Sequence, residues 1–238
     1  MKSTVEQIRA RFDQDVERFS NLETGHTAFV DSLLMLNLMT EAAAAVTPHA
    51  SALLDIGCGA GNYSLKMLGA LPNLNITLTD LSQPMLDRAR ERVASVTRGA
   101  VTTIQSDIRD LELGAEQFDI ILAVAVFHHL RTDEEWYAVF EKCLIALKPG
   151  GALWIADMVK HDIASIQALM WTRYGEYLVN LRGEAYRDQV YAYIEDEDTP
   201  RSLGYQLDIL RAVGFPQVEV LHKNGCFAAF GGIKRQAL

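Results

Sequence analysis

The sequence predicts an α/β fold: a doubly wound, mostly parallel sheet with helices on both faces. From Ser51 onward, apolar segments of strand length alternate with helical segments, a rhythm typical of parallel sheets. The first apolar segment, 53–56, leads into Gly57-Cys58-Gly59-Ala60-Gly61. A glycine-rich turn between a strand and a helix is a common cradle for nucleotide-like ligands. The 238 residues suffice for one such domain with small additions.

The net charge and the cysteine spacing argue against some classes of ligand. The net charge of -9 argues against a nucleic-acid-binding surface, which needs clustered lysines and arginines. The three cysteines, Cys58, Cys143 and Cys226, form no CxxC pair. We therefore predict neither a disulfide framework nor a zinc site, and no metal ligands.

No targeting or membrane segment is expected. The chain shows no basic stretch followed by an apolar one, as a signal peptide would. The apolar stretch 27–46 carries Asp31, Asn37 and Glu41, so it is predicted to be a packed helix and not a membrane span. We expect a cytoplasmic protein without a membrane partner.

Residues 1–50 are predicted to be a helical cover. Val5, Ile8, Phe12, Val16 and Phe19 recur at helical spacing with charged residues between them. Such a segment cannot form a core alone and must pack on the domain that follows, residues 51–238. It is either structural cover or a lid, and in the second case Phe12, Phe19 and His26 lie near the ligand.

The rest of the domain follows from alternation and turn chemistry. Ser82 before Gln83-Pro84 marks a helix start, and Lys148-Pro149-Gly150-Gly151 marks a helix stop. Strands are predicted at 53–56, 75–79, 101–106, 118–126 and 152–157, with helices at 61–70, 83–96 and 133–147.

Residues 160–200 interrupt this alternation and are predicted to be a helical insertion rich in aromatic residues. Within it, 195–198 (Glu-Asp-Glu-Asp) is predicted to be a solvated acidic turn. A helix follows at 203–213, and strands 218–221 and 227–230 form a hairpin around Asn224-Gly225, a dipeptide favoured in tight turns. An antiparallel pair is therefore predicted at the end of the sheet.

The loop and nearby acids indicate the cofactor. The third glycine of the NAD fingerprint G-x-G-x-x-G is replaced by Asn62. Asp55, which ends the strand before the loop, would repel a pyrophosphate and attract an ammonium group. S-adenosylmethionine has an ammonium and a sulfonium and no phosphate. Asp80 lies where an acid can reach ribose hydroxyls, and Asp107 where it can accept from an adenine amine.

These motifs together resemble class I S-adenosylmethionine-dependent methyltransferases. Residues 54–61 resemble the family's first motif, 78–80 its acidic motif, 106–108 its adenine motif and 147–151 the turn before strand five. Residues 210–215 resemble its Leu-x-x-Ala-Gly-Phe stretch, with Val213 replacing the alanine. The resemblance implies a Rossmann-like, seven-stranded sheet with the last strand antiparallel. It implies these cofactor-binding residues: Asp55, Gly57, Cys58, Gly59, Asn62, Asp80, Leu81, Met85, Asp107, Ile108, Ala123 and Val124.

The acceptor is expected to be a small molecule. Where amine-methylating branches of the family carry Asn or Asp-Pro-Pro-aromatic, this chain has Ala125-Val126-Phe127-His128-His129-Leu130. His128 and Asp157, near the carboxyl ends of strands four and five, are the catalytic candidates. The substrate-binding candidates are His129, Trp171, Tyr174, Tyr177 and Arg182. The alternative role for the aromatic residues of the insertion is in the core of a helical cap or in a homodimer contact.

Three other functions compete with methyl transfer. The chain more loosely resembles the carboxy-S-adenosylmethionine synthases of tRNA modification, but it has Gly25-His26 where those enzymes have Gly-Tyr. It could instead bind S-adenosylmethionine without turning it over. A dehydrogenase ranks third, since NAD would have to bind despite Asp55 and Asn62.

Overall fold

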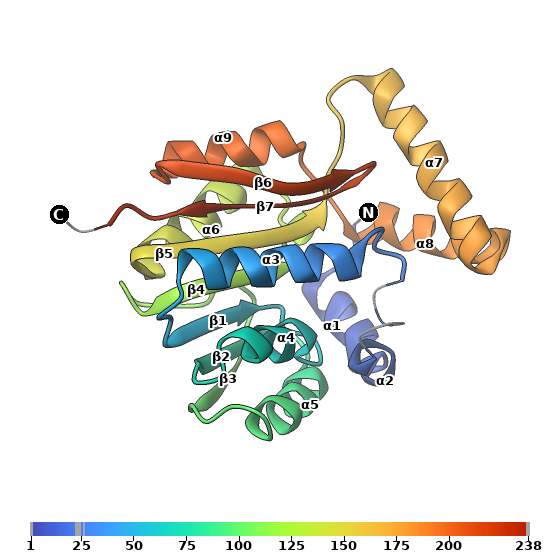
Figure 1. Cartoon of the computed structure of the whole chain (residues 1–238). Helices are drawn as coiled ribbons and strands as arrows, with labels where there is room; N and C mark the ends of the chain where they lie inside the picture. Colours follow the sequence, from blue (N-terminus) through green and yellow to red (C-terminus); the bar gives the residue numbers. More distant parts are fainter. Residues whose placement is uncertain (1, 22–24, 26, 237–238) are drawn as a thin grey trace.

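The computed structural model describes residues 2–21, 25 and 27–236 (Figure 1). At its centre lies a seven-stranded sheet with the order β3-β2-β1-β4-β5-β7-β6. The strands are β1 (Ala52–Ile56), β2 (Asn75–Asp80), β3 (Val101–Gln105), β4 (Phe118–Val124), β5 (Leu147–Met158), β6 (Gln217–Asn224) and β7 (Phe227–Ile233). The helices are α1 (Val5–Asp13), α2 (Val16–Ser20), α3 (Ser32–Val46), α4 (Asn62–Ala70), α5 (Gln83–Ala94), α6 (Asp133–Ala146), α7 (Ala164–Arg182), α8 (Glu184–Glu197) and α9 (Leu203–Val213), with a 3₁₀ turn at Phe127–His129.

The strand directions confirm the predicted fold class. Strands β1 to β5 pair in parallel, and β7 runs antiparallel to both β5 and β6. The β6–β7 hairpin turns at Asn224-Gly225, as predicted, and Gly225 has a φ of 53°. This is the seven-stranded, Rossmann-like sheet with its last strand antiparallel.

Alternating side chains on the strands fill two cores. Leu53, Ile120 and Trp154 face the side covered by α3, α4 and α5, whereas Leu54 and Ile121 face α6 and α9. The inner strands β4 and β7 are buried on both faces and almost wholly apolar, whereas β3 and β6 at the two edges carry polar and exposed residues.

Some boundaries differ from the prediction because the backbone changes direction early. The fourth strand ends at Val124, two residues before the predicted end, since Ala125 has a φ of 55° and a 3₁₀ turn follows. The helix predicted over 27–46 begins only at Ser32, after Asp31 with a φ of 59°. The fifth strand begins at Leu147, directly after α6.

The prediction of a solvated acidic turn at 195–198 is wrong. Helix α8 continues through Glu197, and both Glu197 and Asp198 are buried. Glu197 accepts two hydrogen bonds from the Arg11 guanidinium, and Asp198 lies against two histidines. Partners distant in the sequence therefore offset the cost of burying these two acids.

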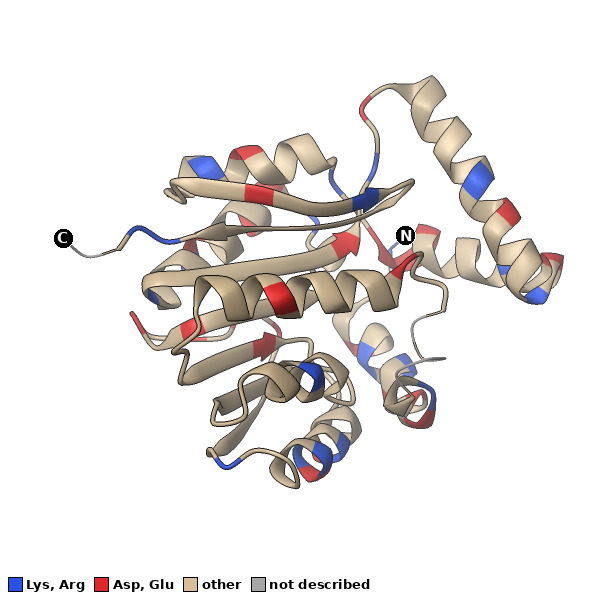
Figure 2. Ribbon diagram, in the orientation of Figure 1, with Lys and Arg blue, Asp and Glu red and all other residues tan. Residues whose placement is uncertain are grey.

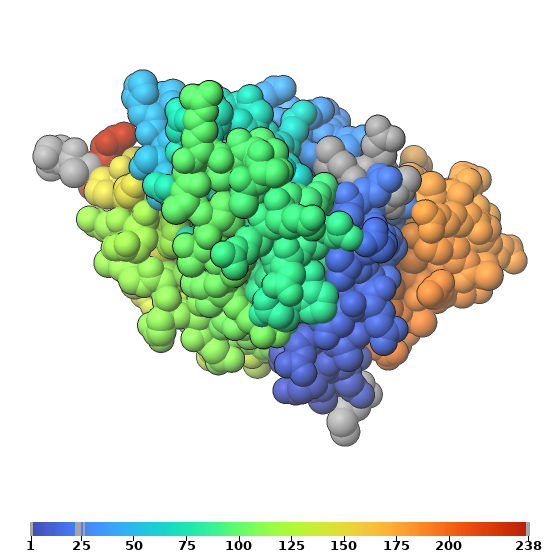
Figure 3. Space-filling view, turned by 90° about the horizontal axis from the view of Figure 1, so that it is seen from below, coloured from blue at the N-terminus to red at the C-terminus, as the bar shows by residue number. Residues whose placement is uncertain are grey.

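The N-terminal helices and the insertion lie together at the carboxyl ends of the parallel strands. Figure 3 shows the N-terminal segment packed between the green part of the domain and the orange insertion. Tyr174 and Tyr177 of α7 donate to the carbonyl oxygens of Ala28 and Thr27, at 3.0 and 2.7 Å. None of the helices in the described part of the chain has the length and apolarity to cross a bilayer.

Candidate active site

A cavity lies over the carboxyl ends of β1, β2 and β4, and residues of α1, α2, α7 and α8 help to wall it. All predicted cofactor-binding residues line this cavity except Ala123. Ala123 is fully buried in the core under α6, because neighbouring residues of a strand point to opposite faces. Its neighbour Val124 lines the cavity.

The glycine loop brings main chain directly to the cavity. Gly57 has a φ of 63°, and a Cβ added to it would lie 2.4 Å from a methyl group of Val126. Gly59 also has a positive φ, of 50°, yet a Cβ there would meet nothing within 4 Å. The first glycine is thus required by packing, whereas the second leaves room for a ligand against the backbone.

Two carboxyl groups lie next to this loop: Asp55, which is buried, and Asp80, which is partly buried. Asp80 accepts from the main-chain N–H groups of Gly59 and Ser82, at 2.8 and 2.9 Å, and Asp55 accepts from the Ser64 hydroxyl at 2.6 Å. Burial raises the pKa of Asp55 to about 7, and the charge of Asp80 adds to this rise; burial also raises the pKa of Asp80. A cationic ligand would relieve this cost and a phosphate would increase it. The pair therefore fits the ammonium and hydroxyl groups of S-adenosylmethionine.

Asp107 and Asn62 have partners within the protein. Both oxygens of Asp107 accept from the Arg109 guanidinium, at 2.9 and 2.6 Å. Burial raises the pKa of Asp107, but Arg109 outweighs it and the net pKa is lowered. The Asn62 amide donates to the main-chain oxygen of Phe19 at 2.8 Å, which ties the loop to the N-terminal segment.

The predicted catalytic pair forms a buried, ordered unit. Asp157 is fully buried, and one of its oxygens pairs with Nδ1 of His128. The other accepts from the main-chain N–H groups of Phe127 and His128, at 2.9 and 3.2 Å. His128 lines the cavity but Asp157 does not. Asp157 is therefore placed to orient His128, and its predicted catalytic role can operate only through that imidazole.

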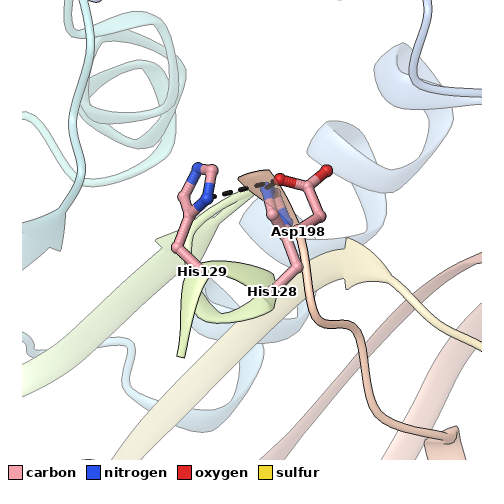
Figure 4. Close-up of side chains that lie close together, drawn as sticks. All are labelled: His128, His129 and Asp198. Carbon is pink, nitrogen blue, oxygen red and sulfur yellow. Dashed lines mark ion pairs between the residues drawn. The ribbon is translucent and has the colours of Figure 1, made fainter. Parts of the chain in front are cut away.

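Asp198 is one of the site residues that the sequence did not reveal. Its Oδ1 lies 3.6 Å from Nε2 of His128 and 3.3 Å from Nδ1 of His129 (Figure 4). Burial lowers the pKa of His128, but Asp157 and Asp198 together raise it to about 9. No local signal marks Asp198, since it ends an acidic run that resembles a solvated surface.

The predicted substrate-binding residues divide into two groups. His129 and Tyr174 line the cavity, whereas Trp171, Tyr177 and Arg182 do not. Trp171 stacks on Tyr191 with ring centroids 4.6 Å apart. For Trp171, Tyr177 and Arg182, substrate binding stays a prediction without a contact to this cavity.

The N-terminal segment also contributes to the lining. Phe12 and Phe19 reach the cavity, as expected for a lid, and His26 lies outside the described residues. Arg11, Arg18 and Tyr193 line it as well, although nothing in their local sequence distinguished them.

Comparison with known proteins identifies the class. Residues 53–151 match the family model described as a methyltransferase domain. These residues therefore form a methyltransferase domain of the class I, S-adenosylmethionine-dependent type, and S-adenosylmethionine is the cofactor that the loop and the acids fit.

Several named relatives share parts of the chain. Malonyl-acyl-carrier-protein O-methyltransferase of Halalkalibacterium halodurans is 37% identical over 105 residues, 43% of this chain and 37% of that protein. The demethylmenaquinone methyltransferase of Listeria monocytogenes is 24% identical over 188 residues, 77% of this chain and 78% of the relative. The carboxy-S-adenosyl-L-methionine synthase of Chromohalobacter salexigens is 27% identical over 187 residues, 76% of this chain and 67% of the relative. The chain spans less than half the length of the malonyl-acyl-carrier-protein methyltransferases that it matches.

Among solved structures, the cyclase SpnF aligns with a TM-score of 0.65 at 15% identity, over 100% of this chain and 98% of that one. At 15% identity, this similarity shows a shared fold and says nothing about activity.

Proposed function

We propose that the protein transfers the methyl group of S-adenosylmethionine to a small-molecule acceptor. The observation that carries this proposal is a single cavity that extends from Asp55 and Asp80 to His128, His129 and Asp198. A cofactor held at the first pair would face an acceptor held at the second group. Methyl transfer is an in-line displacement, so this placement supplies much of what the reaction needs.

In the reaction, an electron pair of the acceptor atom forms the new bond to the methyl carbon. The carbon–sulfur bond breaks, its electrons return to sulfur, and neutral S-adenosylhomocysteine leaves. The low-dielectric cavity excludes water from this step. Phe12 and Phe19 of the N-terminal segment would act as the lid that closes the cavity, with residues 1–50 as a cover over the domain 51–238.

The lining also suggests the class of acceptor. Phe12, Phe19, Tyr174, Tyr193 and Phe227 give the cavity aromatic walls. These walls favour an acceptor with an apolar or aromatic body. Burial lowers the pKa of His129 well below its usual value, so its neutral imidazole can accept the proton that an oxygen nucleophile such as a phenol, an enol or a quinol loses on methylation.

Turnover on an acceptor panel tests the proposal. The protein would be incubated with S-adenosylmethionine and a set of phenols, quinols and apolar carboxylic acids, with S-adenosylhomocysteine followed by mass spectrometry. We expect formation that depends on one acceptor class and is lost in His129→Ala. The matched control is His49→Ala, because His49 is exposed and lies before β1, at the opposite edge of the sheet. Cofactor binding without turnover across the panel would instead indicate a non-catalytic binding protein.

Carboxy-S-adenosylmethionine synthesis is the second candidate, since that relative aligns with 76% of the chain. Mass spectrometry of the cofactor retained through purification separates the two activities. We expect S-adenosylmethionine or S-adenosylhomocysteine. A carboxylated cofactor would refute plain methyl transfer.

A further inference from the structure

Three side chains with metal-ligating atoms meet at the acceptor end of the cavity (Figure 4). They are His128 and His129 from the 3₁₀ turn after β4 and Asp198 from the end of α8. We propose that these residues form a binding site for a divalent transition-metal ion. The site itself rests on this geometry alone, and only its use in methyl transfer depends on the proposed function.

The spacing of the ligand atoms fits one ion. The three atoms all lie within 4.8 Å of one another, and Oδ1 of Asp198 is 3.3 Å from Nδ1 of His129 and 3.6 Å from Nε2 of His128. Bonds of about 2.0–2.1 Å in a tetrahedral site put neighbouring ligand atoms about 3.3 Å apart. The two distances to Asp198 are therefore already close to those of a metal site, and the remaining pair of ligand atoms lies within 4.8 Å.

Two of these atoms have no other partner among the described residues. Nδ1 of His129 and Oδ1 of Asp198 are buried and accept no hydrogen bond there. The Asp198 side chain is 2% exposed. Oδ1 of Asp198 has the two imidazoles nearby but a hydrogen bond to neither, and a buried carboxylate oxygen without a hydrogen bond is costly. A metal ion would provide the missing partner for both atoms.

His128 is already oriented as a ligand. Asp157 binds its Nδ1 and is itself held by the main-chain N–H groups of Phe127 and His128. This arrangement directs Nε2 toward Asp198 and the cavity. A carboxylate behind a metal-ligating imidazole is the usual outer support of such sites, because it fixes the tautomer and the ring orientation.

The surrounding charges leave room for a cation. Arg11 is paired with Glu197, and Arg109 with Asp107 and Glu135. The cation of Lys2 donates to the main-chain oxygen of Asp198 at 2.6 Å.

After these pairings, the carboxylates of Asp157 and Asp198 remain around two imidazoles. Two nitrogens and one oxygen favour zinc or iron over magnesium or calcium. All three ligand residues line the cavity, so the open coordination position faces the acceptor. There the ion would bind and polarise the acceptor oxygen.

Metal uptake by the untagged, chelator-treated protein tests the site. Zn²⁺ would be titrated by calorimetry, and Co²⁺ by its visible absorption, which intensifies in a four-coordinate site. We expect one ion per chain. Asp198→Asn and His129→Ala should weaken Zn²⁺ binding at least about tenfold, and Asp157→Asn about 10- to 100-fold. Asp196→Asn and His49→Ala are the matched controls, since both residues are exposed, and they should bind Zn²⁺ as the unaltered protein does.

Absence of uptake, or equal uptake by Asp198→Asn and Asp196→Asn, would overturn the proposal. S-adenosylmethionine affinity, measured in each variant, verifies that the domain is folded, because the cofactor acids lie at the other end of the cavity. If Zn²⁺ binds as expected but no acceptor is methylated, the metal site stands and the proposed function fails.

Discussion

The two ends of the cavity are built in different ways. At the cofactor end, Asp55 lies one residue before the end of β1 and Asp80 ends the adjacent strand β2, and the glycine loop follows β1 directly. At the acceptor end, His128 and Asp198 are separated by about 70 residues and meet only because the insertion folds back over β4. Figure 2 shows acidic segments of the ribbon at the arrowheads of β1 and β5. The sheet alone positions the residues of the cofactor end, whereas the acceptor end also needs the insertion that follows β5.

The largest expected effect is a loss of catalysis without a loss of cofactor binding, caused by a change at the acceptor end. His128→Gln should lower kcat by about 100-fold, as loss of one positioned polar group in an active site commonly does. The Kd for S-adenosylmethionine should stay within about twofold, because this side chain lies at the acceptor end. Steady-state kinetics and calorimetry check the two numbers. An equal loss in both would show that the two ends are not independent.

Asp80→Ala, at the cofactor end, should weaken the binding of S-adenosylmethionine, which His128→Gln should leave unchanged. Hydrogen bonds to a charged group contribute about 1.5–3 kcal/mol, so cofactor affinity should fall about 10- to 100-fold in calorimetry. Asp87→Ala is the control, since Asp87 is exposed on α5. Unchanged affinity in Asp80→Ala would contradict the cofactor assignment.

A pH effect on the cofactor-free protein should follow from Asp55. Its folded-state pKa of about 7 lies above the usual value of 3.8. The folded state therefore binds the proton more tightly, and this contribution to stability is lost as pH rises through the folded-state pKa. Between pH 5 and 7 the protein should lose about 2 kcal/mol relative to Asp55→Asn, whose amide resembles the protonated acid.

Melting temperatures measured across that range check the expectation. The difference between Asp55→Asn and the unaltered protein should grow with pH. A constant difference would mean that Asp55 in the folded protein does not gain or lose a proton differently from the unfolded chain between pH 5 and 7, and would contradict the raised pKa.

The smallest effect concerns the insertion. Trp171→Leu should cost about 1 kcal/mol, because it removes the stack on Tyr191. Trp171→Phe keeps an aromatic ring and serves as the control. The acceptor KM should not change, since Trp171 lies outside the cavity lining. A raised KM in the leucine variant would restore Trp171 as a substrate-binding residue.

The sequence by itself determined the sheet and the cofactor end. Apolar runs marked strands buried on both faces, Ser82 caps α5 as predicted, and α9 has the predicted bounds Leu203–Val213. These features depend on neighbours in the chain, whose spacing is visible in the sequence. Asp55 and Asp80 could be predicted for the same reason, since each lies in the last two residues of a strand.

Only the tertiary structure decided the acceptor end. The run 195–198 has the composition of a solvated turn, yet Arg11 and the two histidines lie against its last two residues. The positions of two other predicted site residues also depend on distant partners. Asp157 is buried and pairs with Nδ1 of His128, and Trp171 stacks on Tyr191 within the insertion. Burial of a charged or aromatic side chain depends on partners far away in the sequence, and no local pattern records them.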